Sequence, residues 1–245
     1  MRPVISLVCL ASIVALAACS EEPEPVSNPR EWATIPDPEA RERDHAEGVA
    51  QAQEREQPPA VQTGDQRAPD QFTVRLETTK GPILIDVTRA WAPYGADRFY
   101  TLVREGYFTD VAFFRVIDGF MAQAGIHGDP EVNTRWRPRS IPDDPVRQSN
   151  TRGMVSYAMG GPGSRTTQFF INYTDNSRLD SMGFAPFGRV RDMAAADALY
   201  KGYGEGAPRG RGPDQSRIQR EGNAYLRAEF PQLDYIQRAS IVEGP

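Results

Sequence analysis

The run from Phe113 to Gly125 restricts the possible folds of this chain more than any other segment, because it reads as a β-hairpin with polar residues at fixed positions. Asp118-Gly119 lies between two apolar runs, and this dipeptide is a strong local signal for a turn between antiparallel strands. Arg115 and Gln123 are the polar residues of the two arms. Because an unpaired buried charge is costly, an arginine in an apolar strand requires a partner or a ligand.

The length of the turn decides which residues face each other across the hairpin. A two-residue loop at Asp118-Gly119 would place Arg115 opposite Ala122. A three-residue loop from Asp118 to Phe120 would instead place Arg115 opposite Gln123. Side chains directly opposite each other on one face of a hairpin are in contact. We therefore predict the three-residue loop, because it gives the arginine a polar neighbour.

Two further segments follow the hairpin in a fixed order. One runs Gly153-Met154-Val155-Ser156-Tyr157-Ala158-Met159-Gly160-Gly161-Pro162 and then Gln168-Phe169-Phe170-Ile171, and the other runs from Leu179-Asp180 to Phe187-Gly188-Arg189-Val190. Together with the hairpin, these segments resemble the motifs of the cyclophilins, the cyclosporin-binding family of peptidyl-prolyl isomerases. The resemblance covers about residues 71–245, although the stretch 202–232 is longer than the usual link of the family.

The expected fold class is mainly β. Alternation of apolar and polar residues predicts strands at 72–76, 83–87, 153–159, 168–173, 186–190 and 233–242, besides the hairpin. Helical spacing predicts helices at 92–105, 193–200 and 217–232, and the polar, proline-rich stretch 128–150 reads as an ordered loop. Many short strands with a few helices indicate a closed barrel capped by helices. The resemblance implies the same architecture, a closed eight-stranded antiparallel β-barrel with a helix at each end.

The chemistry implied by the resemblance is rotation about the X-Pro bond, which amide resonance holds with a barrier of about 18–20 kcal/mol. A site that favours the twisted amide needs neither a nucleophile nor a cofactor. A guanidinium in a dry apolar pocket suits this task, because it stays charged and offers several donors in a rigid fork. The resemblance implies that Arg115 is catalytic and that Gln123 orients it. The substrate would contact Phe120, Met121, Ala158, Met159, Gln168, Phe170, Leu179 and Phe184.

This chain departs from the family pattern at several site positions. Met159 replaces an asparagine, and Phe184 and Phe114 each stand where many members have histidine. Arg178 falls where several members have the tryptophan that binds cyclosporin. We expect catalysis to survive these changes and cyclosporin affinity to be weak. The alternative is a non-catalytic module that binds proline segments as a chaperone or scaffold, and the intact Arg115 favours the enzyme.

Other functional classes find little support. The only histidines are His45 and His127, so neither a catalytic triad nor a zinc cluster is expected, and we predict no metal or other cofactor. The pair Asp143-Asp144 is interpreted as solvated. The glycines from 202 to 206 lack the strand and lysine of a phosphate-binding loop. A net charge of -5 gives no general basic surface, so nucleic acid is not an expected partner.

The N-terminus reads as a targeting segment. The stretch from Val4 to Ala18 is apolar but too short for a comfortable membrane span, and Leu16-Ala17-Ala18-Cys19 resembles a bacterial lipobox. We predict a lipoprotein signal peptide at 1–18 and lipidation of Cys19. The alternative is an ordinary signal peptide, in which Cys19 is incidental. Cleavage before Cys19 would leave it as the remaining cysteine, occupied by lipid, so no intramolecular disulfide is expected.

Residues 19–70 are polar and proline-rich, which predicts a disordered or partly helical tether before an isomerase domain at 71–245. A docking segment around Trp32 and Ile35 is the alternative. Ser20 after the cysteine favours sorting to the outer membrane, with the domain facing the periplasm. The expected partners are the bilayer, reached through acyl chains on Cys19, and proline-containing segments of folding envelope proteins.

Overall fold

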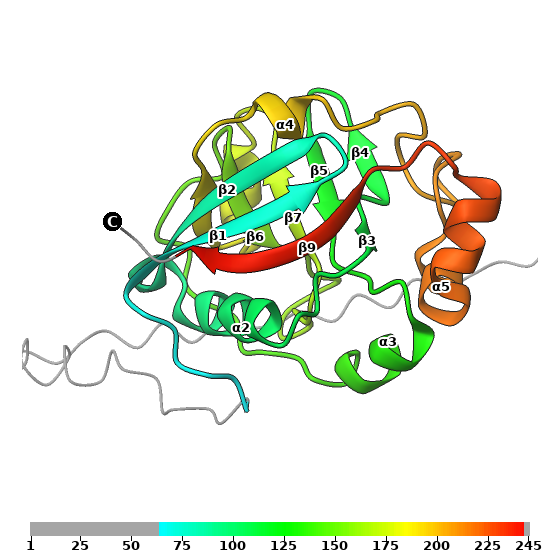
Figure 1. Cartoon of the computed structure of the whole chain (residues 1–245). Coiled ribbons are helices and arrows are strands. Elements are labelled where there is room, and N and C mark those ends of the chain that lie inside the picture. Colours follow the sequence, from blue (N-terminus) through cyan, green and yellow to red (C-terminus); the bar gives the residue numbers. More distant parts are fainter. Residues whose placement is uncertain (1–63, 243–245) are drawn as a thin grey trace, which may run out of the picture. The chain divides into compact units, whose positions relative to one another are not determined.

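The computed structural model describes residues 64–242, which form a curled antiparallel sheet with helices around it (Figure 1). The strands are β1 (Gln71–Thr78), β2 (Gly81–Thr88), β3 (Val111–Ala112), β4 (Arg115–Ile117), β5 (Met121–Ala124), β6 (Met154–Tyr157), β7 (Phe169–Asn172), β8 (Pro186–Val190) and β9 (Tyr235–Val242). The α-helices are α2 (Pro93–Arg104), α3 (Pro130–Trp136), α4 (Ala194–Asp197) and α5 (Gln215–Glu229), and two short 3-10 helices are η1 (Arg89–Trp91) and η2 (Ser177–Met182).

The sheet corrects the expectation of a closed eight-stranded barrel. Nine strands within the described residues pair in the order β3-β9-β1-β2-β8-β6-β7-β5-β4, so β3 and β4 are the two edges of an open half-barrel. Only Phe113 and Phe114 separate these edge strands along the chain. The Phe113 N–H donates to the Asp234 carbonyl, and the two rings are buried in different clusters. The chain therefore changes partner strands at this point, and no ladder joins the two edges.

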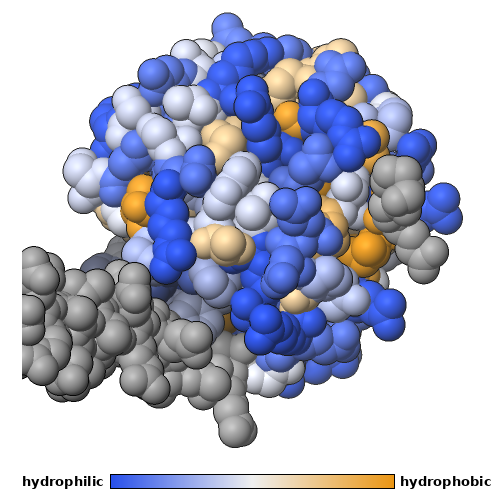
Figure 2. All heavy atoms as spheres, turned by 90° about the vertical axis from the view of Figure 1, so that its left-hand side faces the viewer, coloured by the Kyte–Doolittle hydropathy of each residue, from blue (hydrophilic) through white to orange (hydrophobic). Residues whose placement is uncertain are grey.

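The predicted strands and helices are otherwise confirmed, with ends that differ by a few residues. Strands β1 and β2 bury alternate residues, including Val74, Leu76, Ile83 and Ile85, as the period of two in their sequences predicts. Helix α2 buries Phe99 against this core. Helices α2 and α4 lie at opposite ends of the curled sheet (Figure 1). With the apolar residues inside, the face shown in Figure 2 is mainly hydrophilic.

The stretch 128–150 is not only a loop, because it contains helix α3. Asp129 caps this helix by accepting a hydrogen bond from the Glu131 N–H, and Pro130 occupies its first turn. Helix α3 packs beside α5, where the backbone of Gly222 has a φ of +62°. A Cβ at Gly222 would lie 2.0 Å from the Gly128 carbonyl oxygen, so this close approach requires glycine.

The interpretation of Asp143-Asp144 as a solvated pair is wrong for Asp144. Its carboxylate is buried, accepts hydrogen bonds from the N–H groups of Tyr94 and Gly95, and pairs with the buried Arg165. These N–H groups belong to the first turn of α2, whose own N-cap residue supplies no side-chain acceptor. Asp144 therefore caps α2 from a distant part of the chain, which local sequence does not reveal.

Residues before the expected domain start at 71 already pack against the domain. Asp65 forms an ion pair with the buried Arg98 on α2, and Ala68 is part of the main core. The predicted signal peptide, Cys19 and most of the predicted tether lie outside the described residues. Between residues 64 and 242, the structure has no helix whose length and apolar character would let it span a membrane.

Candidate active site

The hairpin adopts the predicted three-residue register. Arg115 on β4 pairs with Gln123 on β5, and Ile117 pairs with Met121. The Phe120 N–H donates to the Ile117 carbonyl across the turn. Gly119 in this turn has a φ of +67°, a conformation that glycine adopts without strain. The turn thus brings the arginine and the glutamine to the same face.

The strands of this part of the sheet present different residues to its two faces. Met121 and Gln123 on β5 and Phe170 on β7 line a groove on the outer face, whereas Ala122 and Ile171 enter the main core. This division follows from the alternation of side chains along a strand. One face of the sheet therefore packs in the core, and the opposite face forms the groove.

The groove has a volume of about 340 Å³. The structure brings every residue predicted for catalysis or substrate contact to its walls. Its lining consists of Arg115, Phe120, Met121, Gln123, Ala158, Met159, Gly160, Ser164, Thr166, Gln168, Phe170, Leu179, Phe184, Arg209 and Gln215. The lining residues that were not predicted as site residues are Gly160, Ser164, Thr166, Arg209 and Gln215, the last two from the stretch 202–232.

The floor of the groove is apolar. Met121, Phe170 and Leu179 form a buried cluster separate from the main core, and Phe120 and Phe184 pack against it. The rings of Phe170 and Phe184 meet edge to face with centroids 5.7 Å apart. Such a surface suits a small apolar ring, because binding there removes apolar area from water.

Asp180 fixes the segment that carries Leu179. Its carboxylate accepts hydrogen bonds from the Ser149 hydroxyl and from the backbone and side-chain N–H groups of Asn150. Three donors hold the pKa of Asp180 below its ordinary value despite the opposing effect of burial. In the Leu179-Asp180 motif, Leu179 thus lines the groove, and the hydrogen bonds of Asp180 hold this segment in place.

The polar wall is a chain of hydrogen bonds above this floor. Arg115 Nη1 donates to Gln123 Oε1 at 3.0 Å, and Gln123 Nε2 donates to Gln168 Oε1 at 2.9 Å. Gln123 is buried, so these bonds satisfy an amide that has little access to water. The glutamine therefore has a fixed orientation and holds one nitrogen of the guanidinium.

A second partner of Arg115 was not predicted. Glu205 receives hydrogen bonds from Arg115 Nε at 2.6 Å and Nη2 at 2.7 Å, which makes a bidentate ion pair. The hydrogen bonds from Arg115 hold the pKa of the Glu205 carboxyl below its ordinary value. Glu205 is the single acidic residue between Lys201 and Pro213, but this pattern alone does not indicate which basic residue it contacts.

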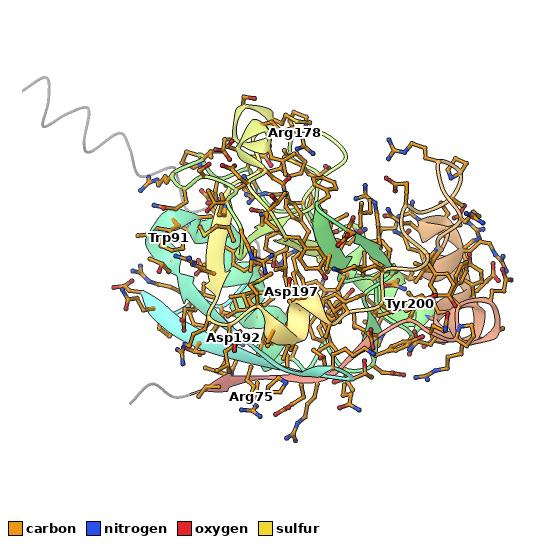
Figure 3. The ribbon with its side chains drawn as sticks, turned by 90° about the horizontal axis from the view of Figure 1, so that it is seen from above. Arg75, Trp91, Arg178, Asp192, Asp197 and Tyr200 are labelled. Carbon is orange, nitrogen blue, oxygen red and sulfur yellow. The ribbon has the colours of Figure 1, made fainter. Side chains whose placement is uncertain are left out.

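Two residues that differ from the family pattern, Phe114 and Arg178, lie in different parts of the structure. Phe114 does not face the groove but is buried beneath α5, in a cluster with Ile218 and Leu226. Arg178 is exposed, and its guanidinium lies 4.9 Å from the centre of the Phe120 ring. Figure 3 shows Arg178 on the side of the molecule opposite to Arg75 of β1.

The histidine in the described chain, His127, lies away from the groove against Tyr107, and burial lowers its pKa. His45 lies outside the described residues. Within residues 64–242, no three His, Cys, Asp or Glu side chains gather in a way that could hold a metal ion. The groove accordingly offers hydrogen-bond donors, acceptors and an apolar floor.

Comparisons with known proteins agree with this arrangement. The sequence model of the family described as "Cyclophilin type peptidyl-prolyl cis-trans isomerase/CLD" matches residues 73–214. The chain is 36% identical over 134 residues to the "Peptidyl-prolyl cis-trans isomerase-like 3" of Rhizopus delemar, covering 50% of this chain and 77% of that protein. It is 32% identical over 146 residues to the "Peptidyl-prolyl cis-trans isomerase cyp18" of Streptomyces antibioticus, covering 56% and 88% respectively.

A solved structure shows the same fold. The crystal structure of a cyclophilin type peptidyl-prolyl cis-trans isomerase from Cryptosporidium parvum is similar with a TM-score of 0.54 and 22% sequence identity, covering 71% of this chain and 99% of that chain. At this level of identity the likeness concerns the fold alone. The family match ends at residue 214, directly before α5 begins.

Proposed function

The chain belongs to the cyclophilin-type peptidyl-prolyl cis-trans isomerases, and on that premise we propose that Arg115 accelerates the isomerisation of X-Pro bonds held in the groove. One observation carries this proposal. The guanidinium of Arg115 is held at fixed positions beside an apolar floor, and it keeps N–H groups that neither Glu205 nor Gln123 uses.

The mechanism follows from the electronic structure of the amide. When the X-Pro bond twists, resonance is lost and the proline nitrogen gains a lone pair. An N–H group of Arg115 would donate to that lone pair, while Phe170 and Leu179 hold the proline ring. The planar amide has no such lone pair, so the hydrogen bond favours the twisted state over the ground state. With a proline ring on the apolar floor, the hydrogen bond would lie in surroundings of low dielectric, which strengthens it.

The test compares the wild type with Arg115→Ala in NMR exchange measurements on a short X-Pro peptide. Removing one donor to the transition state is expected to lower the catalysed rate on the order of 100-fold. Peptide affinity should fall much less, because the apolar floor remains. Binding by the wild type without acceleration above the background rate would instead support the alternative of a non-catalytic proline-binding module.

We propose proline-containing segments of other polypeptides as substrates. A second Cryptosporidium parvum structure, with a TM-score of 0.51 and 21% identity, was determined in the presence of the dipeptide Ala-Pro. In this chain, the groove has room for a proline ring on the floor and for backbone beside Ala158 and Met159. The predicted envelope location makes folding envelope proteins the proposed clients.

The proposed location rests on the lipobox-like segment around Cys19. Acyl chains on Cys19 would hold the protein on the outer membrane, with the domain facing the periplasm. The Cys19→Ser variant should lose palmitate labelling and move from the membrane fraction to the soluble fraction. Unchanged labelling and membrane binding would contradict the lipoprotein assignment and leave the isomerase assignment intact.

A further inference from the structure

We propose that Glu205 is a positioning residue for the isomerase: its carboxylate fixes the guanidinium of Arg115 from behind the groove. This inference rests on the proposed role of Arg115. Glu205 belongs to the segment 201–214, here called the insertion loop, which connects α4 to α5. The loop runs beside edge strand β4, where Gly204 forms a β-bridge with Val116.

The direction of the contact leaves Arg115 available to a substrate. The Glu205 carboxylate accepts hydrogen bonds from Nε and Nη2 of Arg115, and Gln123 Oε1 accepts one from Nη1. Nη1 also donates to Met121 Sδ at 3.9 Å, a weak acceptor, and Nη2 has no second hydrogen-bond partner among the described residues. Two strong partners therefore hold the planar group, and a substrate would compete only with the weak sulfur contact for the remaining N–H groups.

Glu205 does not occupy the substrate space. Arg115 lines the groove, whereas Glu205 is not among the lining residues. The carboxylate thus lies on the far side of the guanidinium, and a substrate on the apolar floor would meet the arginine and not its partner. This arrangement distinguishes a positioning contact from one that competes with substrate.

The insertion loop is built to hold Glu205 in one place. The Gly206 N–H donates to Glu205 Oε1 at 2.9 Å, and the Gly212 N–H donates to the Glu205 carbonyl at 2.8 Å. A Cβ at Gly210 would lie 2.1 Å from that carbonyl oxygen, so the loop packs too tightly for a side chain there. The glycines therefore serve close packing around the Glu205 backbone.

Contacts outside the loop fix it to the rest of the domain. The Tyr203 ring packs edge to face on Phe230 with centroids 5.0 Å apart. Lys201 Nζ donates to Asp118 Oδ1 at 2.7 Å, which joins the loop to the turn of the hairpin. The position of the carboxylate is thus set by packing and hydrogen bonds on both sides, before any substrate arrives.

A free arginine side chain samples many rotamers, and only some of them would point a donor at the proline nitrogen. Gln123 alone fixes one nitrogen and leaves the plane of the guanidinium free to turn. The bidentate contact with Glu205 fixes that plane. Holding a catalytic group in its reactive geometry raises the rate of the chemical step more than it raises substrate affinity. Loss of Glu205 should therefore affect kcat more than KM.

The experiment measures kcat and KM by NMR exchange for the wild type, Glu205→Gln, Glu205→Ala and Arg115→Ala. Glu205→Gln keeps the size of the side chain and removes its charge. We expect kcat to fall on the order of tenfold in both Glu205 variants, with KM within about twofold of the wild type. Glu221→Gln is the matched control, because Glu221 pairs with Arg217 on the surface of α5 and does not line the groove. Its kcat should equal that of the wild type.

A spectroscopic readout separates positioning from a general loss of structure. The Nε–H signal of Arg115, identified by its loss in Arg115→Lys, should be sharp and protected from solvent exchange in the wild type. In Glu205→Gln it should shift and exchange faster, while the backbone amide spectrum stays folded.

The outcomes also distinguish this inference from the proposed function. An active wild type, an inactive Arg115→Ala and a fully active Glu205→Gln would overturn the positioning role alone. A kcat that rises in Glu205→Gln would also overturn it, because the carboxylate would then be inhibitory. A wild type that gives no rate acceleration would overturn the proposed function of Arg115 itself.

Discussion

Arg115 has one partner that the sequence reveals and one that it does not. Gln123 was predicted because a hairpin fixes which residues lie opposite each other. Glu205 comes from a loop far along the chain, and no local pattern indicates which charged group such a loop approaches. The apolar residues of the floor, with Ala158, Met159 and Gln168, were found by resemblance to a family. Arg209 and Gln215 were not, because they lie in the stretch 202–232, which this resemblance describes poorly.

The ion pair of Arg115 and Glu205 predicts an acidic limit to activity. Arg115 lowers the pKa of the Glu205 carboxyl, and the nearby charge of Arg209 acts in the same direction. The carboxylate therefore keeps its charge as the pH falls from neutral to the ordinary glutamate value of about 4.3. Below that value it becomes protonated, and the contact with Arg115 weakens. The kcat should be level above about pH 4.3 and decline only below it.

NMR exchange at a series of pH values measures this limit, with circular dichroism to confirm that the protein stays folded. Glu205→Gln carries no titrating group at this position and should lack the decline. A decline that begins near neutral pH, or one that persists in Glu205→Gln, would show that another group is responsible.

Arg178 predicts weak inhibition by cyclosporin. It stands where several cyclophilins have the tryptophan that binds this ligand, and its exposed guanidinium lies over the Phe120 ring. A charged, hydrated group is a poor partner for an apolar cyclic peptide. Arg178→Trp should lower the inhibition constant by about fivefold, since one aromatic contact contributes about 1 kcal/mol. Arg178→Lys, which keeps the charge, is the control and should leave the inhibition constant unchanged.

At the scale of single elements, periodic segments were predictable and capping contacts were not. The alternation in β1 and β2 and the apolar spacing in α2 gave their positions to within a few residues. Helix α3 was missed because Pro130–Trp136 is short and has no repeated apolar spacing. Its start signal, an aspartate before a proline, was present but lay within a proline-rich stretch.

Asp144 shows how such a distant contact determines stability. Its side chain is 0% exposed and pairs with Arg165, which is 2% exposed. Asp144→Asn would leave the arginine with a weaker buried partner and remove the charge at the N-terminus of α2. Breaking a buried pair costs about 3–5 kcal/mol, and we expect a loss of unfolding free energy of this order in urea titrations.

Asp143 provides the matched control, because it contacts the same arginine from the surface. Its side chain is 35% exposed, and its carboxylate lies 3.3 Å from Arg165 Nε. Asp143→Asn should cost less than about 1 kcal/mol, as exposed pairs usually do. Equal losses for the two variants would mean that burial does not determine the contribution of Asp144.

At the scale of the whole molecule, the class of fold was predictable and the closure of the sheet was not. Short alternating strands indicate a curled β-sheet from sequence alone. Whether the last edge pairs with the first depends on the backbone at Phe113 and Phe114, where the chain leaves β9 and joins β5. The change from pairing with β9 to pairing with β5 depends on the backbone angles of Phe113 and Phe114. The residue types at these two positions do not specify those angles.

The start of the domain gives a prediction for the whole molecule. The side chains of Arg98 and Asp65 are 0% and 3% exposed, and Arg98 Nε donates to Asp65 Oδ1 at 2.8 Å. A chain that begins at Gln71 would lack this carboxylate and leave a buried arginine charge with only carbonyl acceptors. Removing one partner of a buried ion pair costs about 3–5 kcal/mol, so this chain should unfold at lower urea concentration than a chain that begins at Gly64.

The comparison needs a variant that separates the ion pair from the other lost contacts. Asp65→Asn in the chain that begins at Gly64 removes the charge and keeps Ala68 in the core. If the ion pair dominates, this variant should reproduce most of the loss seen on truncation to Gln71. A chain that begins at Ser20 should match the one that begins at Gly64, because the predicted tether would add no stabilising contact. Equal urea midpoints for the chains beginning at Gly64 and Gln71 would contradict the prediction and restore residue 71 as the start of the domain.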